Sequence, residues 1–282
     1  MTSPETVGLA ADDGSTITRQ QWRWSVLAAM ASYLDAGSIV ALGAGLTLFQ
    51  AEFGLTSTGV GILAAIGPNA IGCALGALVG GRLGDRLGRK RIYKWDLLIY
   101  ALGVLLIALS VDPAMLFVGT FVVGLAVGAD VPTSLSLVGE IAPARGRGRL
   151  LGLTQVAWSI GPVVVLVLAL VLSSLGLLGI RIVFLHLFVA ALVTWALRRG
   201  IAESARWTAA AGAAGALGVR ARELLRGPHL RALLWSGSIY TFWGLPPAPR
   251  ASSPRTWCRP WAREPRRRAW RSRAPGSSSA SS

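Results

Sequence analysis

Residues 81–91 read GRLGDRLGRKR, a short basic run between two long apolar stretches. Its two outer glycines, Gly81 and Gly88, allow a tight turn and a close approach of the backbone. A short loop rich in Arg and Lys stays on the cytoplasmic side of a membrane. The run therefore predicts a cytoplasmic hairpin loop that joins two membrane helices. Within it, Asp85 is placed to pair with the neighbouring cations or with a helix N-terminus.

The composition of the chain favours an integral membrane protein. Of its 282 residues, 53% are hydrophobic, and the mean hydropathy is +0.55. An ordinary soluble domain is less apolar than this. The net charge of +15 would suit nucleic acid, but most of it lies in short loops and in the last 37 residues, so we expect no nucleic-acid partner. Cys73 and Cys258 lie far apart and no metal-ligand cluster is visible, so we expect no disulfide framework, metal or cofactor.

Apolar runs long enough to cross a bilayer recur along the chain. They cover roughly residues 24–49, 58–80, 95–111, 114–139, 151–173 and 178–197. The connections alternate in charge. Those at 50–57, 111–114 and 174–177 lack Lys and Arg, whereas those at 82–94, 140–149 and 198–231 are rich in them. This alternation predicts an all-α, polytopic bundle in the plasma membrane, the inner membrane of a bacterium, with a cytoplasmic N-terminus.

The expected bundle covers residues 21–198, and the segments on either side of it differ in kind. We expect residues 1–20 to form a flexible cytoplasmic arm. We expect residues 199–231 to form a cytoplasmic loop with an amphipathic helix, and residues 232–245 to form an incomplete seventh span. Residues 246–282 contain no Leu, Ile or Val, and nine arginines and one glutamate give them a charge of +8. Such a tail cannot bury enough apolar surface to fold. Our hypothesis is a frameshift near codon 246; the alternative is a tether to anionic lipid or nucleic acid.

Two acidic residues lie inside apolar runs. Asp35 is near the middle of the first run, and Asp130 lies well inside the fourth. A carboxylate at the centre of a membrane helix costs roughly 2.5–3.5 kcal/mol on insertion scales. This cost favours a functional carboxylate that faces a water-filled path or a charged partner. The alternative is a structural acid that the surrounding helices satisfy.

The order of residues in the run 81–91 resembles that of a known protein family. The pattern G-x-L-x-D-R-x-G-R-K resembles the loop between the second and third helices of the major facilitator superfamily. The matching residues are Gly81, Leu83, Asp85, Arg86, Gly88, Arg89 and Lys90. Two further segments, Glu140–Arg149 and Glu203–Trp207, resemble loops of its sugar-porter branch, and Ala126–Pro132 resembles a segment of phosphate and organic-anion symporters. The resemblance covers about residues 19–245.

The resemblance implies the N-terminal half of a transporter that alternates access by rocking two six-helix halves around a midplane site. It implies proton-coupling or substrate-binding roles for Asp35 and Asp130, and a sugar-binding role for Gln155. Two departures, Pro162 in place of a second sugar-binding glutamine and Thr120 in place of a fourth-helix arginine, leave the substrate open between a sugar and a small organic or inorganic anion. The residues implied in a cytoplasmic gating network are Gly81, Asp85, Arg86, Gly88, Arg89, Lys90, Glu140, Arg147, Glu203 and Arg206.

The expected partners are a small-molecule substrate, the proton as coupling ion, and the lipid bilayer. We expect a secondary active transporter and not an enzyme. The alternative is a transport-inactive six-helix remnant or a partner subunit, because members of the family normally have two six-helix halves. A homodimer would rebuild a twelve-helix pore.

Overall fold

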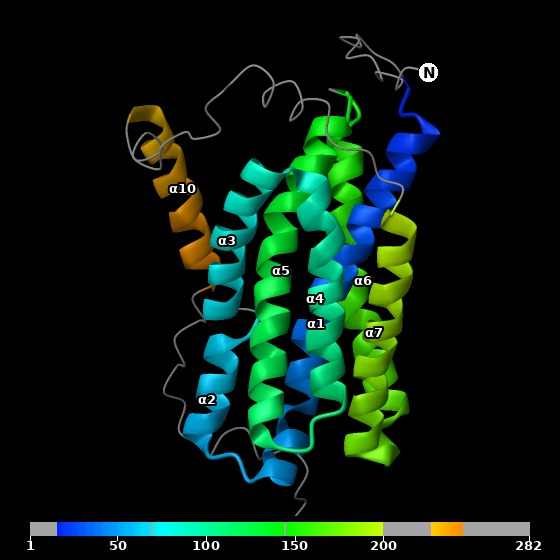
Figure 1. Cartoon of the computed structure of the whole chain (residues 1–282), viewed down its shortest axis with the longest axis vertical. Coiled ribbons are helices and arrows are strands. Elements are labelled where there is room, and N and C mark those ends of the chain that lie inside the picture. Colours follow the sequence, from blue (N-terminus) through cyan, green and yellow to red (C-terminus); the bar gives the residue numbers. More distant parts are fainter. Residues whose placement is uncertain (1–15, 69, 144, 200–226, 245–282) are drawn as a thin grey trace, which may run out of the picture. The chain divides into compact units, whose positions relative to one another are not determined.

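The computed structural model describes residues 16–68, 70–143, 145–199 and 227–244. All regular elements in these ranges are helical, which confirms the all-α class. The chain divides into two units, residues 1–217 and residues 218–282, and each is described by itself. The first unit is a bundle of long helices (Figure 1). Its elements are α1 (Arg19–Phe53), α2 (Ser57–Ile66), α3 (Ile71–Leu87), α4 (Arg89–Ala108), α5 (Pro113–Ile141), α6 (Arg147–Val171), η1 (Ser173–Leu175) and α7 (Leu177–Arg198).

The bundle has the helix lengths of a membrane domain. Within the described residues, five segments are long and apolar enough to cross a bilayer: α1, the α2–α3 segment from Ser57 to Gly84, α5, α6 and α7. Helix α4 has 20 residues, which is long enough to span. It is less apolar because Arg89, Lys90, Arg91, Lys94 and Asp96 all fall near its start.

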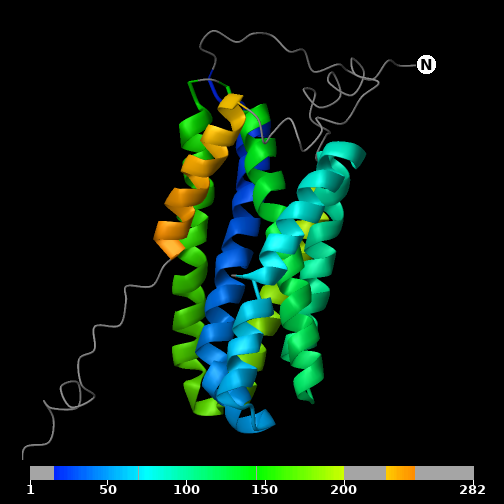
Figure 2. The ribbon, with the colours of Figure 1, turned by 90° about the vertical axis from the view of Figure 1, so that its left-hand side faces the viewer.

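The helices pack around α1 and α5. Helix α1 contacts α6, α7 and α5, whereas α5 contacts α3 and α4, and α4 also contacts α7. The two views in Figures 1 and 2 show α1 and α5 running side by side with the other long helices of the bundle. The largest hydrophobic cluster runs through these contacts and includes Phe49, Tyr100, Leu116 and Phe184.

Local signals define the helix starts. Thr18 and Gln21 form a capping box at the start of α1. The side-chain Nε2 of Gln21 also donates a hydrogen bond of 2.9 Å to the carbonyl of Ile141, which ties α1 to the end of α5. At the other end of the bundle, Asp112 caps α5 and Pro113 occupies its first turn.

The predicted hairpin loop over residues 81–91 was wrong in its length, because the observed connection is much shorter. Helix α3 continues to Leu87 and α4 begins at Arg89, so Gly88 alone separates them. Gly88 has a φ of 92°, a backbone conformation that favours glycine. Gly81 lies inside α3, and no heavy atom lies within 4 Å of where its Cβ would stand, so it serves neither a turn nor a close approach.

Small residues bring α3 and α5 into backbone contact. The break between α2 and α3 includes Gly67 and Pro68, while Asn69 lies outside the described residues. Beyond the break, a Cβ on Gly76 would lie 2.1 Å from the carbonyl oxygen of Leu125, and one on Gly128 would lie 2.1 Å from that of Cys73. Such small-residue packing is typical of helices that associate in lipid.

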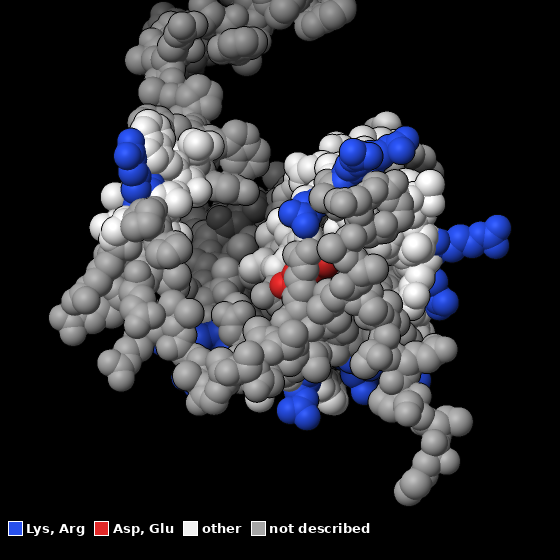
Figure 3. Space-filling view, turned by 90° about the horizontal axis from the view of Figure 1, so that it is seen from above, with Lys and Arg blue, Asp and Glu red and all other residues white. Residues whose placement is uncertain are grey.

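Cations gather at one end of the bundle, where α1, α4 and α6 begin and α3, α5 and α7 end. We call it the basic end, and Figure 3 looks onto it. Its exposed cations are Arg19, Arg23, Arg82, Arg86, Lys90, Arg91, Lys94, Arg145, Arg149 and Arg199. Near the opposite end, the half-buried Arg181 donates from Nη2 to the carbonyl of Ser110 at 2.7 Å.

The second unit contains one described helix, α10 (Gly227–Gly244). It runs without a break across the predicted boundary at residues 231 and 232. The predicted amphipathic helix belongs to residues 199–231, of which 200–226 lie outside the described residues, so it stays a prediction. The predicted tail, residues 246–282, and residues 1–15 lie outside the described residues.

Candidate functional site

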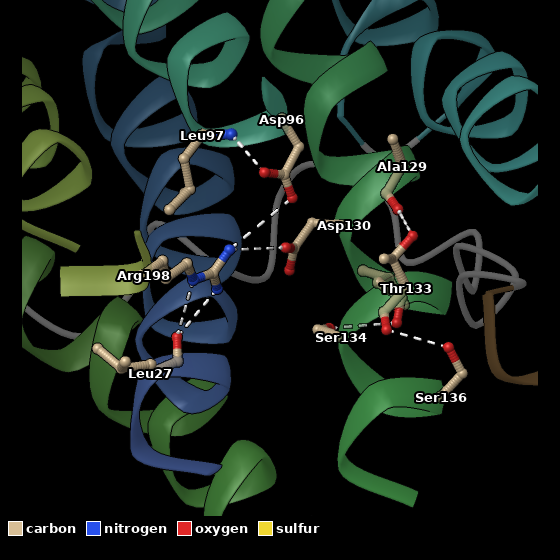
Figure 4. A network of polar contacts seen from close by, with 10 residues as sticks. Leu27, Asp96, Leu97, Ala129, Asp130, Thr133, Ser134, Ser136 and Arg198 are labelled. Atoms are coloured by element: carbon tan, nitrogen blue, oxygen red, sulfur yellow. Dashed lines mark hydrogen bonds and ion pairs between the residues drawn. The ribbon is translucent and has the colours of Figure 1, made fainter. Parts of the chain in front are cut away.

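Among the residues that the structure describes, four charged side chains are buried inside the bundle. Asp96 comes from α4, Asp130 from α5, and Arg198 is the last residue of α7. Nη1 of Arg198 lies 3.3 Å from Oδ1 of Asp130 and 3.8 Å from Oδ2 of Asp96. Figure 4 shows both carboxylates pointing toward the guanidinium. The fourth charge, Asp35, comes from α1 and is also buried. We call these four residues the buried charge cluster.

The guanidinium of Arg198 is held on several sides. Its Nε and Nη2 donate to the carbonyl oxygen of Leu27 on α1, at 3.3 and 2.9 Å. Its Cζ lies 3.6 Å from the centre of the Tyr93 ring, which is a cation–π contact. Arg198 therefore joins α1, α4, α5 and α7. Its planar, fixed charge suits such a buried position better than the flexible ammonium of a lysine.

The helix around Asp130 has weakened backbone bonding. Pro132 lies inside α5 and cannot donate the hydrogen bond that a helix residue normally makes to the carbonyl four positions earlier. Hydroxyl groups cluster directly after it: Thr133 donates to the carbonyl of Ala129 at 2.7 Å, and Ser136 donates to that of Thr133 at 3.0 Å (Figure 4). The sequence thus places a proline and polar side chains beside the carboxylate.

Asp35 lies deeper in the bundle than Leu27, the residue of α1 that Arg198 contacts. It is eight residues beyond Leu27 on α1, which corresponds to about 12 Å along the helix. Asp35 interacts electrostatically with both Asp130 and Arg198. Its Oδ2, like Oδ2 of Asp96 and of Asp130, is buried without a hydrogen-bond partner among the described residues. Oδ1 of Asp96 accepts from the backbone N–H of Leu97 at 2.6 Å.

The charges of the cluster do not balance. The cluster has three buried carboxyl groups, two of them in contact with Arg198, and one buried guanidinium. A buried charge is costly unless it is paired, and one guanidinium can neutralise only one carboxylate. The arrangement can therefore hold protons on the remaining carboxyl groups. Among the described residues, no group of His, Cys, Asp or Glu side chains has the arrangement of a metal site.

The structure brings together two of the three predicted transport residues. Asp35 and Asp130 belong to the cluster, whereas Gln155 is exposed on α6 and lies outside it. Asp96 and Arg198 are not among the site residues predicted from the sequence. Each stands at the edge of a predicted span close to a cation in the sequence, Lys94 for Asp96 and Arg199 for Arg198, where a charge is expected at the membrane surface.

The predicted gating residues are described only in part. Gly81 lies in α3 and Gly88 between α3 and α4; Arg86 and Lys90 are exposed at the basic end. Glu140 near the end of α5 and Arg147 at the start of α6 are half-buried. The side chains of Asp85 and Arg89, and the whole of Glu203 and Arg206, lie outside the described residues. A network that joins all of them stays a prediction.

Three comparisons relate the chain to known proteins. The sequence model of the family described as "Major Facilitator Superfamily" matches residues 25–247. The chain is 42% identical over 229 residues to the minor myo-inositol transporter IolF of Bacillus subtilis, a match that covers 78% of this chain and 52% of that protein. It is 34% identical over 128 residues to the niacin transporter NiaP of Acinetobacter baylyi, covering 45% of this chain and 28% of NiaP.

The solved structures show the same fold. The xylose transporter XylE of E. coli, in a partially occluded inward open conformation, superposes with a TM-score of 0.64 at 19% sequence identity. That match covers 69% of this chain and 51% of XylE. The chain thus spans about half the length of IolF and of XylE.

Proposed function

Because the chain belongs to the Major Facilitator Superfamily, a family of membrane transporters and not of enzymes, we propose that it supplies the N-terminal half of a proton-coupled secondary transporter. The transporter works by alternating access, and the half described here carries the proton-coupling groups. The observation that carries the proposal is the buried charge cluster. A membrane helix retains a costly buried acid where a proton or substrate must pass.

In the proposed mechanism, a proton and Arg198 compete for the carboxylates. When Asp130 is ionised, the guanidinium at 3.3 Å holds it and thereby holds α5 against α7. When Asp130 takes up a proton, this ion pair weakens and Arg198 is left with Asp96 and the carbonyl of Leu27. Asp35, deeper on α1, exchanges the proton with the substrate pathway. Protonation in this way changes the contacts among the four helices that Arg198 joins.

The gating network proposed at the basic end would act on the same contacts. Asp85, Arg86, Arg89, Glu140 and Arg147 come from the ends of helices that meet there. Glu203 and Arg206 would join them from the segment after α7. Ion pairs among these residues would stabilise one access state, and their separation would release it. Because short loops rich in cations stay on the cytoplasmic side, we assign the basic end and the N-terminus to the cytoplasm.

For the substrate we propose a sugar or a cyclic polyol. IolF is named for myo-inositol and matches 78% of this chain at 42% identity, whereas NiaP is named for niacin, an anion, and matches 45% at 34%. Gln155, exposed on α6, offers an amide that can both donate to and accept from hydroxyl groups. A small organic anion remains the second substrate class to be tested.

The test is transport by the purified chain in proteoliposomes, where two copies of the chain would supply the two six-helix halves. We expect myo-inositol, supplied under an inward-directed proton gradient, to enter together with protons that an internal pH dye reports. Niacin, assayed in the same way, tests the anion alternative. If neither compound moves and no substrate-dependent proton flux occurs, the chain alone is not a transporter, and a transport-inactive remnant or partner subunit becomes the better description.

The variant Asp35→Asn tests whether Asp35 couples transport to protons, because it removes the ionisable group with little change in side-chain size. Asparagine has a similar size but neither ionises nor carries an exchangeable carboxyl proton. We therefore expect substrate-dependent proton flux to fall by at least about tenfold, while myo-inositol exchange between equal concentrations persists. The matched control is Asp112→Asn, since Asp112 is exposed at the opposite end of the bundle and asparagine preserves its helix cap. Unchanged proton flux in Asp35→Asn would contradict the assigned role.

A further inference from the structure

An open pocket of about 540 Å³ lies at the basic end, and no residue of the buried charge cluster is among its described lining residues. Leu87 lines it from the end of α3, and Lys90, Arg91, Lys94 and Trp95 line it from α4. Residues at these spacings lie on one face of the first two turns of a helix. All four α4 side chains are exposed, and Nζ of Lys94 lies 5.9 Å from the centre of the Trp95 ring.

An exposed apolar stripe continues from the pocket along the same face of α4. Trp95, Ile99 and Leu102 are 54%, 44% and 54% exposed, and their spacings of four and three residues keep them on one side of the helix. In a membrane helix, such a stripe contacts lipid acyl chains. The cations above it then lie at the level of the headgroups, and a tryptophan between the two marks the interface.

We propose that this face binds one anionic phospholipid. We define the α4 lipid site as Leu87, Lys90, Arg91, Lys94, Trp95, Ile99 and Leu102. The phosphate group would lie against Arg91 and Lys94, and an acyl chain would follow the stripe from Trp95 to Leu102. Basic pockets beside membrane helices on the cytoplasmic side suit anionic headgroups. A free phosphate would use the cations alone and leave the adjoining stripe without a role. The proposal depends on the membrane fold and not on transport.

The experiment measures binding of phosphatidylglycerol and of phosphatidylcholine to the full chain by native mass spectrometry from detergent. We expect one molecule of phosphatidylglycerol to bind more tightly than phosphatidylcholine. Arg91→Gln combined with Lys94→Gln should raise the dissociation constant for phosphatidylglycerol about 25-fold, because each cation near an anionic lipid surface contributes about fivefold. The matched control is Arg145→Gln with Arg149→Gln, which removes the same charge from exposed positions at the same end.

The outcomes separate the lipid site from its alternatives. An equal loss in both double variants would mean attraction by net charge alone and would overturn the proposal. Displacement of the lipid by glycerol 3-phosphate at matched concentration would mean a free-phosphate site and would also overturn it. Leu102→Ser should weaken phosphatidylglycerol binding without changing glycerol 3-phosphate binding. If the double variant fails to fold, Lys94→Gln alone should still show about a fivefold loss, and its absence counts against the site.

Discussion

Replacing Arg198 by leucine should destabilise the bundle more than any other single charge removal near the basic end. The substitution leaves Asp96 and Asp130 buried with no cation and removes both donors to the carbonyl of Leu27. Removing one partner of a buried ion pair costs about 3–5 kcal/mol. We expect a loss of this size in the free energy of unfolding, measured by titration of the detergent-solubilised chain with sodium dodecyl sulfate.

Two further variants test the cause of that loss. Arg199→Leu is the matched control, since the adjacent Arg199 is exposed and its guanidinium Cζ lies 3.9 Å from the centre of the Trp195 ring. It should cost about 1 kcal/mol or less. Combining Arg198→Leu with Asp96→Asn and Asp130→Asn removes the cation together with both carboxylates that contact it and should recover most of the lost stability, because no unpaired charge then remains at this contact. If Arg198→Leu is as stable as Arg199→Leu, the proposed ion pairs do not stabilise the bundle.

The buried charge cluster also shows how far the sequence alone can define the site. Asp35 and Asp130 stand out because an acid inside an apolar run is costly wherever the run is placed in a membrane. Arg198 does not stand out, because arginine after an apolar run is the ordinary signal of a cytoplasmic loop. Its partner Asp130 is 68 residues away in the chain, and only the packing of α7 brings the two together. Long-range pairings of this kind follow from tertiary structure and not from local pattern.

The helix ends show a related limit. Charge alternation and apolar runs sufficed to predict an all-α membrane bundle, which the structure confirms. The predicted hairpin at residues 81–91 is too long because its glycines and cations lie mostly inside helices α3 and α4. A glycine inside a helix costs only about 1 kcal/mol, so α3 continues through Gly81 and Gly84 to Leu87. Among the glycines of this run, only Gly88, with its φ of 92°, requires the special freedom of glycine.

The contact between α3 and α5 should be the most sensitive to added volume. A Cβ on Gly128 would lie 2.1 Å from the carbonyl oxygen of Cys73, and one on Gly76 would lie 2.1 Å from that of Leu125. Both obstacles are backbone atoms, so the two helices must separate to admit even one methyl group. Overpacking of this kind typically costs about 1–3 kcal/mol. Gly128→Ala should therefore lower the free energy of unfolding by about 2 kcal/mol, and Gly128→Val by more.

The matched control lies on the same helix. No heavy atom lies within 4 Å of a Cβ at Gly139, so Gly139→Ala should leave the bundle unchanged or stabilise it by up to about 1 kcal/mol, since alanine is the better helix former. The same unfolding titration compares the two alanine variants. Because both gain the same helix propensity, the difference between their free energies of unfolding reports the packing at Gly128. Gly128 also lies two residues before Asp130, so a displaced α5 should lengthen the contact between Asp130 and Arg198 and lower proton flux in proteoliposomes. Equal stability of Gly128→Ala and Gly139→Ala would show that α3 and α5 are not in backbone contact.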